Sequence, residues 1–239
     1  MDAVYLGLIA ALTSILTACV GLGGGILLLA LMLQILPPIA VIPLHGITQL
    51  FSNASRGWIF RDFLRPEYLK PFITGSIIGA FAFVPLIALV DQVTGSLLLG
   101  IFILLATWWP NLLPLRRLKP LLSGLLTSGL GLIFGAIGAM TMSAHPKEFW
   151  SKEEITGNHA ACMAFQHGIK VIVYAIIGFN ISAYIWEITA LIIGAALGTW
   201  IGTKVLRKIS EKRFKKLLNI VLTTLSIRMI YLSLYTLLS

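Results

Sequence analysis

Long apolar runs, separated by short polar connections, extend along the whole chain. Each run is close to the length that an α-helix needs to cross about 30 Å of hydrocarbon. The first half contains an interrupted apolar segment at 3–36 and plain apolar segments at 39–60, 71–90 and 93–112. The second half contains an interrupted segment at 121–142 and plain segments at 154–178, 183–205 and 214–238. This pattern predicts an all-α protein that crosses a membrane several times.

The composition agrees with a membrane protein and argues against a separate soluble domain. Of the 239 residues, 58% are hydrophobic and 11% are charged, whereas soluble domains carry about 25% charged residues. The net charge of +9 comes from short basic runs between apolar segments, which is typical of cytoplasmic loops and predicts no nucleic-acid partner. Cys19 and Cys162 lie in apolar segments, so no disulfide framework is expected. The first residues lack the basic region of a cleaved signal peptide, so residues 3–20 are expected in the mature protein.

The two halves of the chain resemble each other, which is typical of transporters built from repeats. Three pairs of segments align at offsets of 117, 114 and 119 residues: 7–21 with 124–138, 45–56 with 159–170, and 75–79 with 194–198. The second pair places His45 over His159 and Arg56 over Lys170. We therefore expect one repeat at 1–119 and a second at 120–239.

The basic loops test how often the chain crosses the membrane. They lie at 61–70, 116–119 and 204–216. Eight alternating crossings would place the third loop on the opposite side from the first two, against the positive-inside rule. If each interrupted segment enters the membrane and returns to the same side, all three loops face the cytoplasm and each half crosses three times. The halves are then inverted repeats, with 37–38 and Asp91 on the outer side, although fully spanning interrupted segments stay the alternative.

Glycines interrupt the first apolar segment at 21–25. Each glycine in a helix interior costs about 1 kcal/mol relative to alanine, so a break there needs a reason. A bend that opens a new half-helix offers free backbone N–H groups and the positive end of a helix dipole, which suit an anion. The matching stretch at 138–146 supplies Thr141 and Ser143 instead. The alternative is that the glycines only allow close helix packing, which we expect for Gly75, Gly79, Gly194, Gly198 and Gly202.

The next helix of each half carries a stripe of polar residues. The stripes consist of His45, Gln49, Asn53 and Arg56 in the first half, and His159, His167 and Lys170 in the second. Their spacing of three, four or eight positions places each set on one helix face. An uncompensated charge at the bilayer centre costs about 2.5–3.5 kcal/mol. Because no acidic residue shares the central turns, we expect the substrate to be the counter-ion of Arg56 and Lys170; the alternative is that both side chains snorkel to the surface.

Several motifs together resemble the sulfite exporter TauE/SafE family. They are GLGGG at 21–25, SNASRG at 52–57, a basic loop, GSIIGA at 75–80, and a second copy of the whole unit. The resemblance covers essentially the whole chain. It implies an integral membrane transporter of sulfite, sulfonates or related organosulfur anions. The second bend reads GAMTM, which departs from a second glycine-rich run and leaves the identity of the anion open.

The sequence therefore predicts a secondary transporter of small anions in the cell membrane, exporting because an inside-negative potential expels anions. The anion is expected between the two broken segments, held by Gly23, Gly24, Gly25, His45, Gln49, Asn53, Arg56, Thr141, Ser143, His159, His167 and Lys170. We expect no metal and no cofactor, and a homodimer is compatible with this plan. An anion channel is the nearest alternative. An intramembrane enzyme using Cys19, His45 and His159 is disfavoured because no carboxylate is available to orient a histidine.

Overall fold

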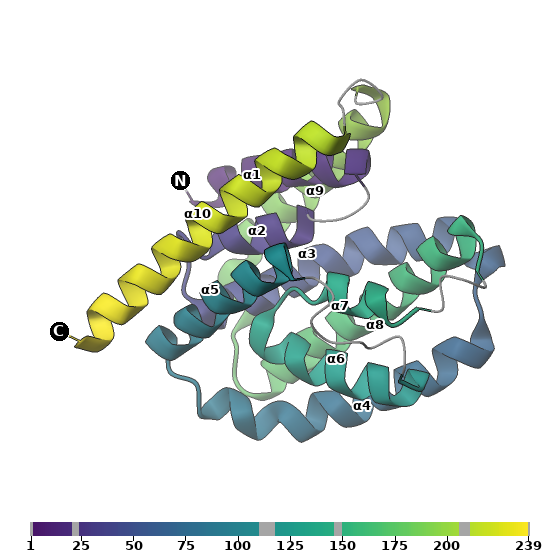
Figure 1. Cartoon of the computed structure of the whole chain (residues 1–239), viewed down its shortest axis with the longest axis horizontal. Coiled ribbons are helices and arrows are strands. Elements are labelled where there is room, and N and C mark those ends of the chain that lie inside the picture. Colours follow the sequence, from purple (N-terminus) through teal and green to yellow (C-terminus); the bar gives the residue numbers. More distant parts are fainter. Residues whose placement is uncertain (1, 21–23, 110–117, 146–149, 206–210, 239) are drawn as a thin grey trace.

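The computed structural model describes residues 2–20, 24–109, 118–145, 150–205 and 211–238, and every regular element in these ranges is helical (Figure 1). The first half contains α1 (Asp2–Val20), α2 (Gly24–Met32), α3 (Pro38–Ile59), the 3₁₀ turn η1 (Arg61–Phe63), α4 (Pro66–Ala88) and α5 (Gln92–Trp108). The second half contains α6 (Pro120–Phe134), α7 (Gly138–Ser143), α8 (Lys152–Ile176), η3 (Ile181–Tyr184), α9 (Ile185–Val205) and α10 (Glu211–Leu238). The predicted all-α class is confirmed.

Local sequence explains where several helices begin. A proline occupies the first turn of α3, α4 and α6, where its missing N–H has no helical partner to lose. Helix α8 begins with a capping box, in which Ser151 and Glu154 satisfy each other's backbone N–H groups. These signals place the helix starts within a few residues of the apolar segments in the sequence.

Each interrupted apolar segment consists of two helices. The first is divided into α1 and α2, and the glycine tip between them, including Gly23, lies outside the described residues. The second is divided into α6 and α7 by Gly135, which ends α6 with a φ of 73° that side chains rarely adopt. The first break falls at the predicted glycines, between Val20 and Gly24. The second was predicted at 138–146 and lies earlier, because Gly135 adopts the φ that ends α6 and residues 138–143 then form α7.

Three helical stretches in the described ranges are long and apolar enough to cross a membrane: 66–87, 181–202 and 219–238. Their outward faces carry large exposed apolar side chains, such as Ile193, Leu197 and Trp200 on α9. A soluble protein would bury such a surface, whereas lipid covers it in a membrane. The predicted multi-pass membrane protein is supported.

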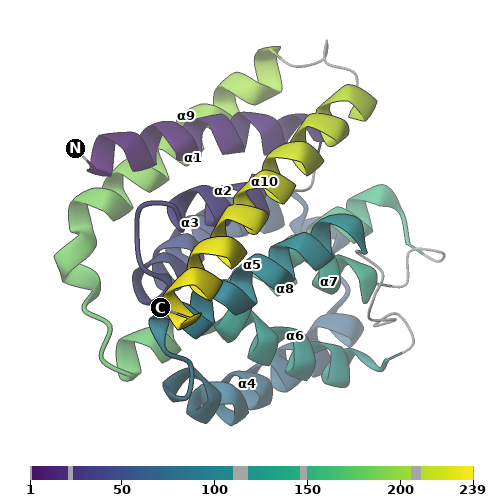
Figure 2. The same ribbon diagram turned by 60° about the vertical axis from the view of Figure 1, so that its left-hand side comes forward.

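The helices pack in four main pairs, α1 with α9, α4 with α6, α3 with α8, and α5 with α10 (Figures 1 and 2). Exchanging α1–α5 for α6–α10 leaves this set of pairs unchanged. Glycines allow two of these pairs to approach closely: a Cβ at Gly75 or Gly79 would overlap backbone carbonyls of α6, and a Cβ at Gly194 or Gly198 would overlap those of α1. The close-packing role predicted for these four glycines is confirmed.

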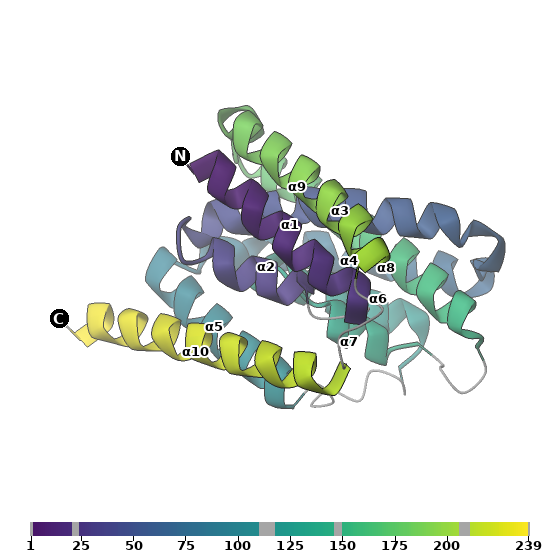
Figure 3. The ribbon, with the colours of Figure 1, turned by 90° about the horizontal axis from the view of Figure 1, so that it is seen from above.

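Helices α3 and α8 run antiparallel. A Cβ added to Gly46, near the start of α3, would lie 3.3 Å from the Val171 side chain near the end of α8. One added to Gly57, near the end of α3, would lie 3.6 Å from the backbone of Ala161. Helices α5 and α10 are also antiparallel and form one edge of the bundle, with the start of α1 and the end of α10 at the same end of the molecule (Figure 3).

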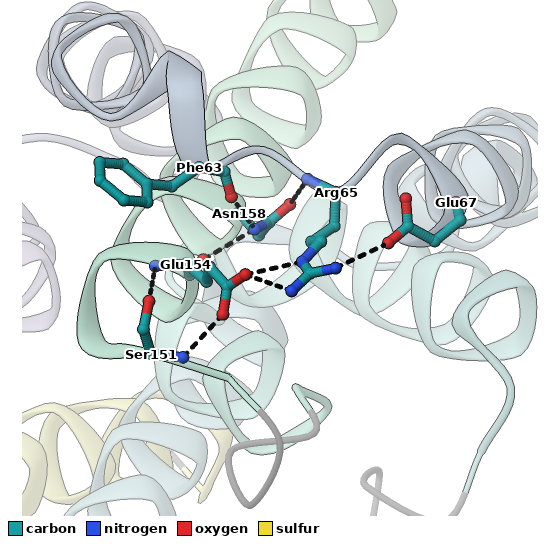
Figure 4. A network of polar contacts seen from close by, with 6 residues as sticks. All are labelled: Phe63, Arg65, Glu67, Ser151, Glu154 and Asn158. Carbon is teal, nitrogen blue, oxygen red and sulfur yellow. Dashed lines mark hydrogen bonds and ion pairs between the residues drawn. The ribbon is translucent and has the colours of Figure 1, made fainter.

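A polar network fastens the connection between α3 and α4 to the start of α8 (Figure 4). The Arg65 guanidinium donates from Nε to the Glu154 carboxylate at 2.8 Å. The Arg65 backbone N–H donates to the side-chain oxygen Oδ1 of Asn158, also at 2.8 Å. The Asn158 amide in turn donates to the backbone carbonyls of Phe63 and Glu154. This network holds the end of α3, and hence its polar stripe, against α8.

The close approach of α4 and α6 predicts an asymmetric effect of adding one methyl group. Gly79→Ala should lower the free energy of unfolding by about 1–3 kcal/mol, because the new Cβ overlaps the Leu125 carbonyl and the helices must separate. Gly168→Ala is the matched control, since its Cβ would meet only the Leu50 side chain at 3.7 Å. Thermal unfolding in detergent measures both, and equal transition temperatures would contradict the packing described here.

Candidate functional site

A small polar cavity of about 30 Å³ lies between α1, the start of α2, α3 and α9. The residues that line it are Thr13, Ser14, Gly24, Gln49, Ser52, Arg56 and Thr199. A single water needs about 10–15 Å³ on this measure, so the cavity has room for two or so water-sized groups. It brings together Gly24, Gln49 and Arg56, three of the residues predicted from the sequence.

The polar stripe of α3 forms one wall of this cavity. Gln49 packs against the start of α2, where a Cβ added to Gly25 would lie 3.5 Å from its amide group. The Asn53 amide donates to the backbone carbonyl of Gln49 at 2.8 Å and lies 3.5 Å from its side-chain oxygen. Asn53 is buried and does not line the cavity, so it positions Gln49 instead of facing the space itself.

Four hydroxyl groups in the lining were not predicted. Thr13 donates its proton to the Ile9 carbonyl at 2.8 Å, and Thr199 donates to the Ala195 carbonyl at 2.8 Å. Such bonds to the preceding turn satisfy a hydroxyl inside a helix, so these residues carry no strong sequence signal. The other two hydroxyls belong to Ser14 and Ser52.

One signal could have found Thr13 and Ser14. The tripeptide Leu-Thr-Ser at 12–14 recurs at 126–128, at the same offset of 114 residues that relates His45 to His159. The alignment of 7–21 with 124–138 uses an offset three residues longer and therefore misses it. Packing favours the shorter offset, because Gly7 lies against α9 in the way that Leu121 lies against α4.

A second polar group joins α3 and α8 close to the broken segments. His45 Nε2 lies 2.9 Å from the Gly25 carbonyl, and the rings of His45 and His167 meet edge to face at 5.7 Å. Lys170 donates from Nζ to the Gly135 carbonyl at 2.5 Å and lies 3.4 Å from His167 Nδ1. Lys170 is 2% exposed, so it does not snorkel to the surface. The carbonyl at the end of α6 attracts a cation by its place at a helix C-terminus.

A third polar group, centred on Gln166 of α8, joins α8 to α4, α6 and α7. The Gln166 amide donates to Thr127 Oγ1 at 2.7 Å and to Ser76 Oγ at 3.2 Å. Its carbonyl oxygen lies 3.4 Å from the hydroxyl of Thr141, one of the predicted site residues. All four residues are buried, and their bonds to one another close this region.

His159 belongs to a fourth group, which is aromatic. Its ring lies 5.5 Å from that of His145, whose Nδ1 is 2.9 Å from the Tyr68 hydroxyl. Trp150 packs against both His145 and Tyr68. Ser143 lies apart from these groups, because its hydroxyl donates to the Met140 carbonyl in its own helix.

The predicted residues therefore follow the antiparallel contact of α3 and α8 and do not surround one point. Lys170 lies beside Gly46, whereas Arg56 lies ten positions further along α3. At about 1.5 Å per residue, the backbone positions of Gly46 and Arg56 are about 15 Å apart along α3. The two side chains therefore leave the helix pair at different levels.

Neither cation has an acidic partner in the described part of the chain. The ion pairs found there join Arg61 to Asp62 and Arg65 to Glu67 and Glu154. The Arg228 guanidinium donates to the Gln34 side chain on the exposed side of α10. The charge of Arg56 is thus available to a bound anion.

A larger cavity of about 230 Å³ lies beyond the Lys170 group, between α3, α4, α5, α6 and α8. Its lining is mainly apolar, and Ile42, Leu132 and Tyr174 separate it from the buried bases by one helical turn. Asp91 lies at this cavity in the connection between α4 and α5. The Thr94 hydroxyl and backbone N–H groups hold the pKa of Asp91 below its usual range, so its carboxylate stays charged.

These features define a multi-pass α-helical membrane protein with basic and polar groups buried between broken helices. The family model described as Sulfite exporter TauE/SafE matches residues 6–229, nearly the whole chain. The chain belongs to this family, and the resemblance seen in the sequence is confirmed. The family implies a membrane transporter of sulfur-containing anions, and its members are transporters and not enzymes. Searches of curated proteins and of solved structures return no significant match.

The buried Gln166 network predicts a clear effect on stability. Gln166→Met keeps the size of the side chain but leaves the hydroxyls of Thr127 and Ser76 without its amide, which should cost about 1–3 kcal/mol of unfolding free energy. Ser55→Ala is the control, because this exposed hydroxyl only donates to the Phe51 carbonyl and its loss should cost less than about 0.5 kcal/mol. Thermal unfolding in detergent compares the two, and similar losses would show that the network contributes little.

Proposed function

We propose that the chain is a secondary transporter, working as an exporter, of small organosulfur anions such as sulfite or sulfonates. The oxyanion group binds in the cavity at the start of α2. The observation that carries this proposal is the lining of that cavity, in which Arg56, Gln49 and the hydroxyl groups face one small space. None of the described lining residues is acidic, so the cavity favours an anion over a cation.

The chemistry of the lining suits a sulfur oxyanion. Gly24 begins α2, so backbone N–H groups without helical partners and the positive end of the helix dipole lie at the cavity. The planar guanidinium of Arg56 can donate two parallel hydrogen bonds to two oxygens of the same anion. Hydroxyl groups of Ser14 and Ser52 can donate to a third oxygen.

Two inverted repeats, 1–119 and 120–239, are part of the proposal. The helix pairs remain the same when the halves are exchanged, which supports a repeat. Helices α3 and α8 are counterparts, and they pack antiparallel, which supports the inverted arrangement. The protein is then in the cytoplasmic membrane, with its basic loops at 61–70, 116–119 and 204–216 inside.

A carrier fits these features better than a channel. A channel needs a continuous polar path. In this protein, Ile42, Leu132 and Tyr174 lie between the larger cavity, at the connection of α4 and α5, and the buried side chains of His45, His167 and Lys170. The cavity at Arg56 is small and enclosed by helices of both halves. An enclosed site between two repeats suits alternating access, in which one half moves against the other.

Ligand binding by the purified protein tests the proposal directly. A thermal-shift screen in detergent would compare sulfite, sulfate, thiosulfate, sulfoacetate and taurine, with chloride at equal ionic strength as the control. Binding to the folded state raises the unfolding temperature, and at equal ligand concentration the tighter ligand raises it more. We expect one or more of the sulfur anions to stabilise the protein, and stabilisation by none of them would refute the proposed substrate class.

Replacing the cavity cation should weaken anion binding. Arg56→Gln removes a charge-assisted contact worth about 1.5–3 kcal/mol, which corresponds to about a tenfold to hundredfold loss of affinity. Arg56→Lys should keep part of the affinity, because the charge remains and the planar fork is lost. Arg228→Gln is the matched control and should bind like the parent, since Arg228 lies on the exposed side of α10. Isothermal titration measures all three; equal affinities would place the anion elsewhere.

Cysteine labelling tests the orientation of the halves. After Cys19 and Cys162 are replaced by serine, single cysteines replace Asp91 and Ser151, which are both exposed. An impermeant thiol reagent applied to intact cells should label position 91 at once and position 151 only after permeabilisation. Labelling of both positions from outside would contradict the inverted arrangement.

A further inference from the structure

His45 has one ring nitrogen that nothing in the anion site explains. The residue is 1% exposed, and its Nδ1 atom has no hydrogen-bond partner among the described residues. A buried acceptor without a donor is costly, and most such groups in folded proteins have a partner. This atom therefore points to something that is bound only during part of the working cycle.

The hydrogen-bond partner of His45 determines which of its two ring nitrogens carries the hydrogen. His45 Nε2 lies 2.9 Å from the Gly25 carbonyl, and a carbonyl can only accept. Nε2 must then carry the hydrogen and donate it, which leaves Nδ1 as a bare lone pair in the neutral ring. His45 can take one further proton, and only at Nδ1.

The groups around His45 make that proton depend on a nearby anion. The titratable groups that face it are His167 and Lys170, both on α8, and the ring of His167 lies 5.7 Å away. Helix α2, on the other side, contributes no titratable side chain and offers the Gly25 carbonyl. Lys170 is already held by the Gly135 carbonyl, so a second positive charge on His45 is repelled unless a negative charge arrives.

We propose that His45 Nδ1 takes up a proton when the anion binds, so that protonation of the protein and anion binding are coupled. This inference rests on the proposed function, because the anion supplies the compensating charge. In the binding step one proton from solution adds to the Nδ1 lone pair, forming an imidazolium, and no other bond forms or breaks. When the anion leaves, repulsion from Lys170 expels the proton again.

The anion and the proton meet at the start of α2. Gly24 lines the anion cavity, and the next residue, Gly25, accepts the hydrogen bond from His45. Gln49, one helical turn after His45 on the same face of α3, also lines the cavity. An anion that binds at this bend thus meets the backbone segment, Gly24 and Gly25, that accepts the hydrogen bond from His45. Proton and anion binding must then favour each other to the same extent.

Proton uptake on anion binding tests this inference. Thiosulfate and methanesulfonate serve as probes, because neither takes up a proton near neutral pH, and a pH indicator follows the weakly buffered protein in detergent. The parent should take up about one proton per bound anion. His45→Gln, whose amide can still donate to Gly25, should bind the probe more weakly than the parent and take up no proton. His145→Gln, at a buried histidine outside this group, should behave like the parent.

The outcomes separate this inference from the proposed function. Anion binding without proton uptake by the parent, or equal uptake by His45→Gln, overturns the proton site and leaves the anion transporter intact. If neither probe nor any of the sulfur anions of the thermal-shift screen binds, the proposed function is overturned, and the ring of His45 is then examined directly. Nitrogen-15 spectra of labelled histidine, assigned by comparison with His45→Gln, should show a neutral Nε2–H ring at pH 7.5 without anion. A charged ring or an Nδ1–H ring under these conditions overturns the inference by itself.

Discussion

The structure depends on one exchange of hydrogen bonds inside the membrane. Where α6 ends at Gly135, the last backbone carbonyls of the helix lose their helical partners, and lipid offers none. Lys170 supplies one partner by donating to the Gly135 carbonyl. A broken helix end and a buried base would each be unfavourable alone, and here they satisfy each other. In the first half, His45 donates to the Gly25 carbonyl in the first turn of α2 and so ties α3 to the start of that helix.

Close packing of the remaining helices makes this exchange possible. The glycines of α4 and α9 bring these helices against the backbones of α6 and α1, the long arms of the two broken segments. Since lipid is as apolar as the helix surfaces, such contact, and not burial from water, holds the arms in place. The Arg65 network adds a polar fastening at the end of α3. The bends are thereby fixed opposite the polar stripes that serve them.

Much of the fold could be predicted from the sequence, because apolar length and glycine position are strong local signals in a membrane protein. The helices begin and end within a few residues of the expected segments, and the first break falls at its glycines. The second break lies at Gly135 and not at the predicted bend of 138–146, since the helical stretch 138–143 carried no signal that distinguished it from a bend. The arrangement of the functional site was harder to predict. Spacing along one helix shows which residues share a face, but not how two helices are aligned, so the separation of Arg56 from Lys170 could not be predicted. Thr13 and Thr199 were not predicted, because threonines whose hydroxyls bond to their own helix are common and the sequence does not show which of them line a cavity.

The two halves of the chain arrange their polar side chains differently, although their sequences resemble each other. At the offset of 114 residues, Thr127 corresponds to Thr13 and Gln166 to Ser52. In the first half a short serine leaves a cavity beside Arg56, whereas in the second half the longer glutamine fills the space and bonds to Thr127. Lys170, freed from that space, reaches the carbonyl at the end of α6 and joins the histidines. The shorter side chain of Ser52 thus lies at a small polar cavity beside Arg56, whereas the longer side chain of Gln166 lies in a region closed by its own hydrogen bonds.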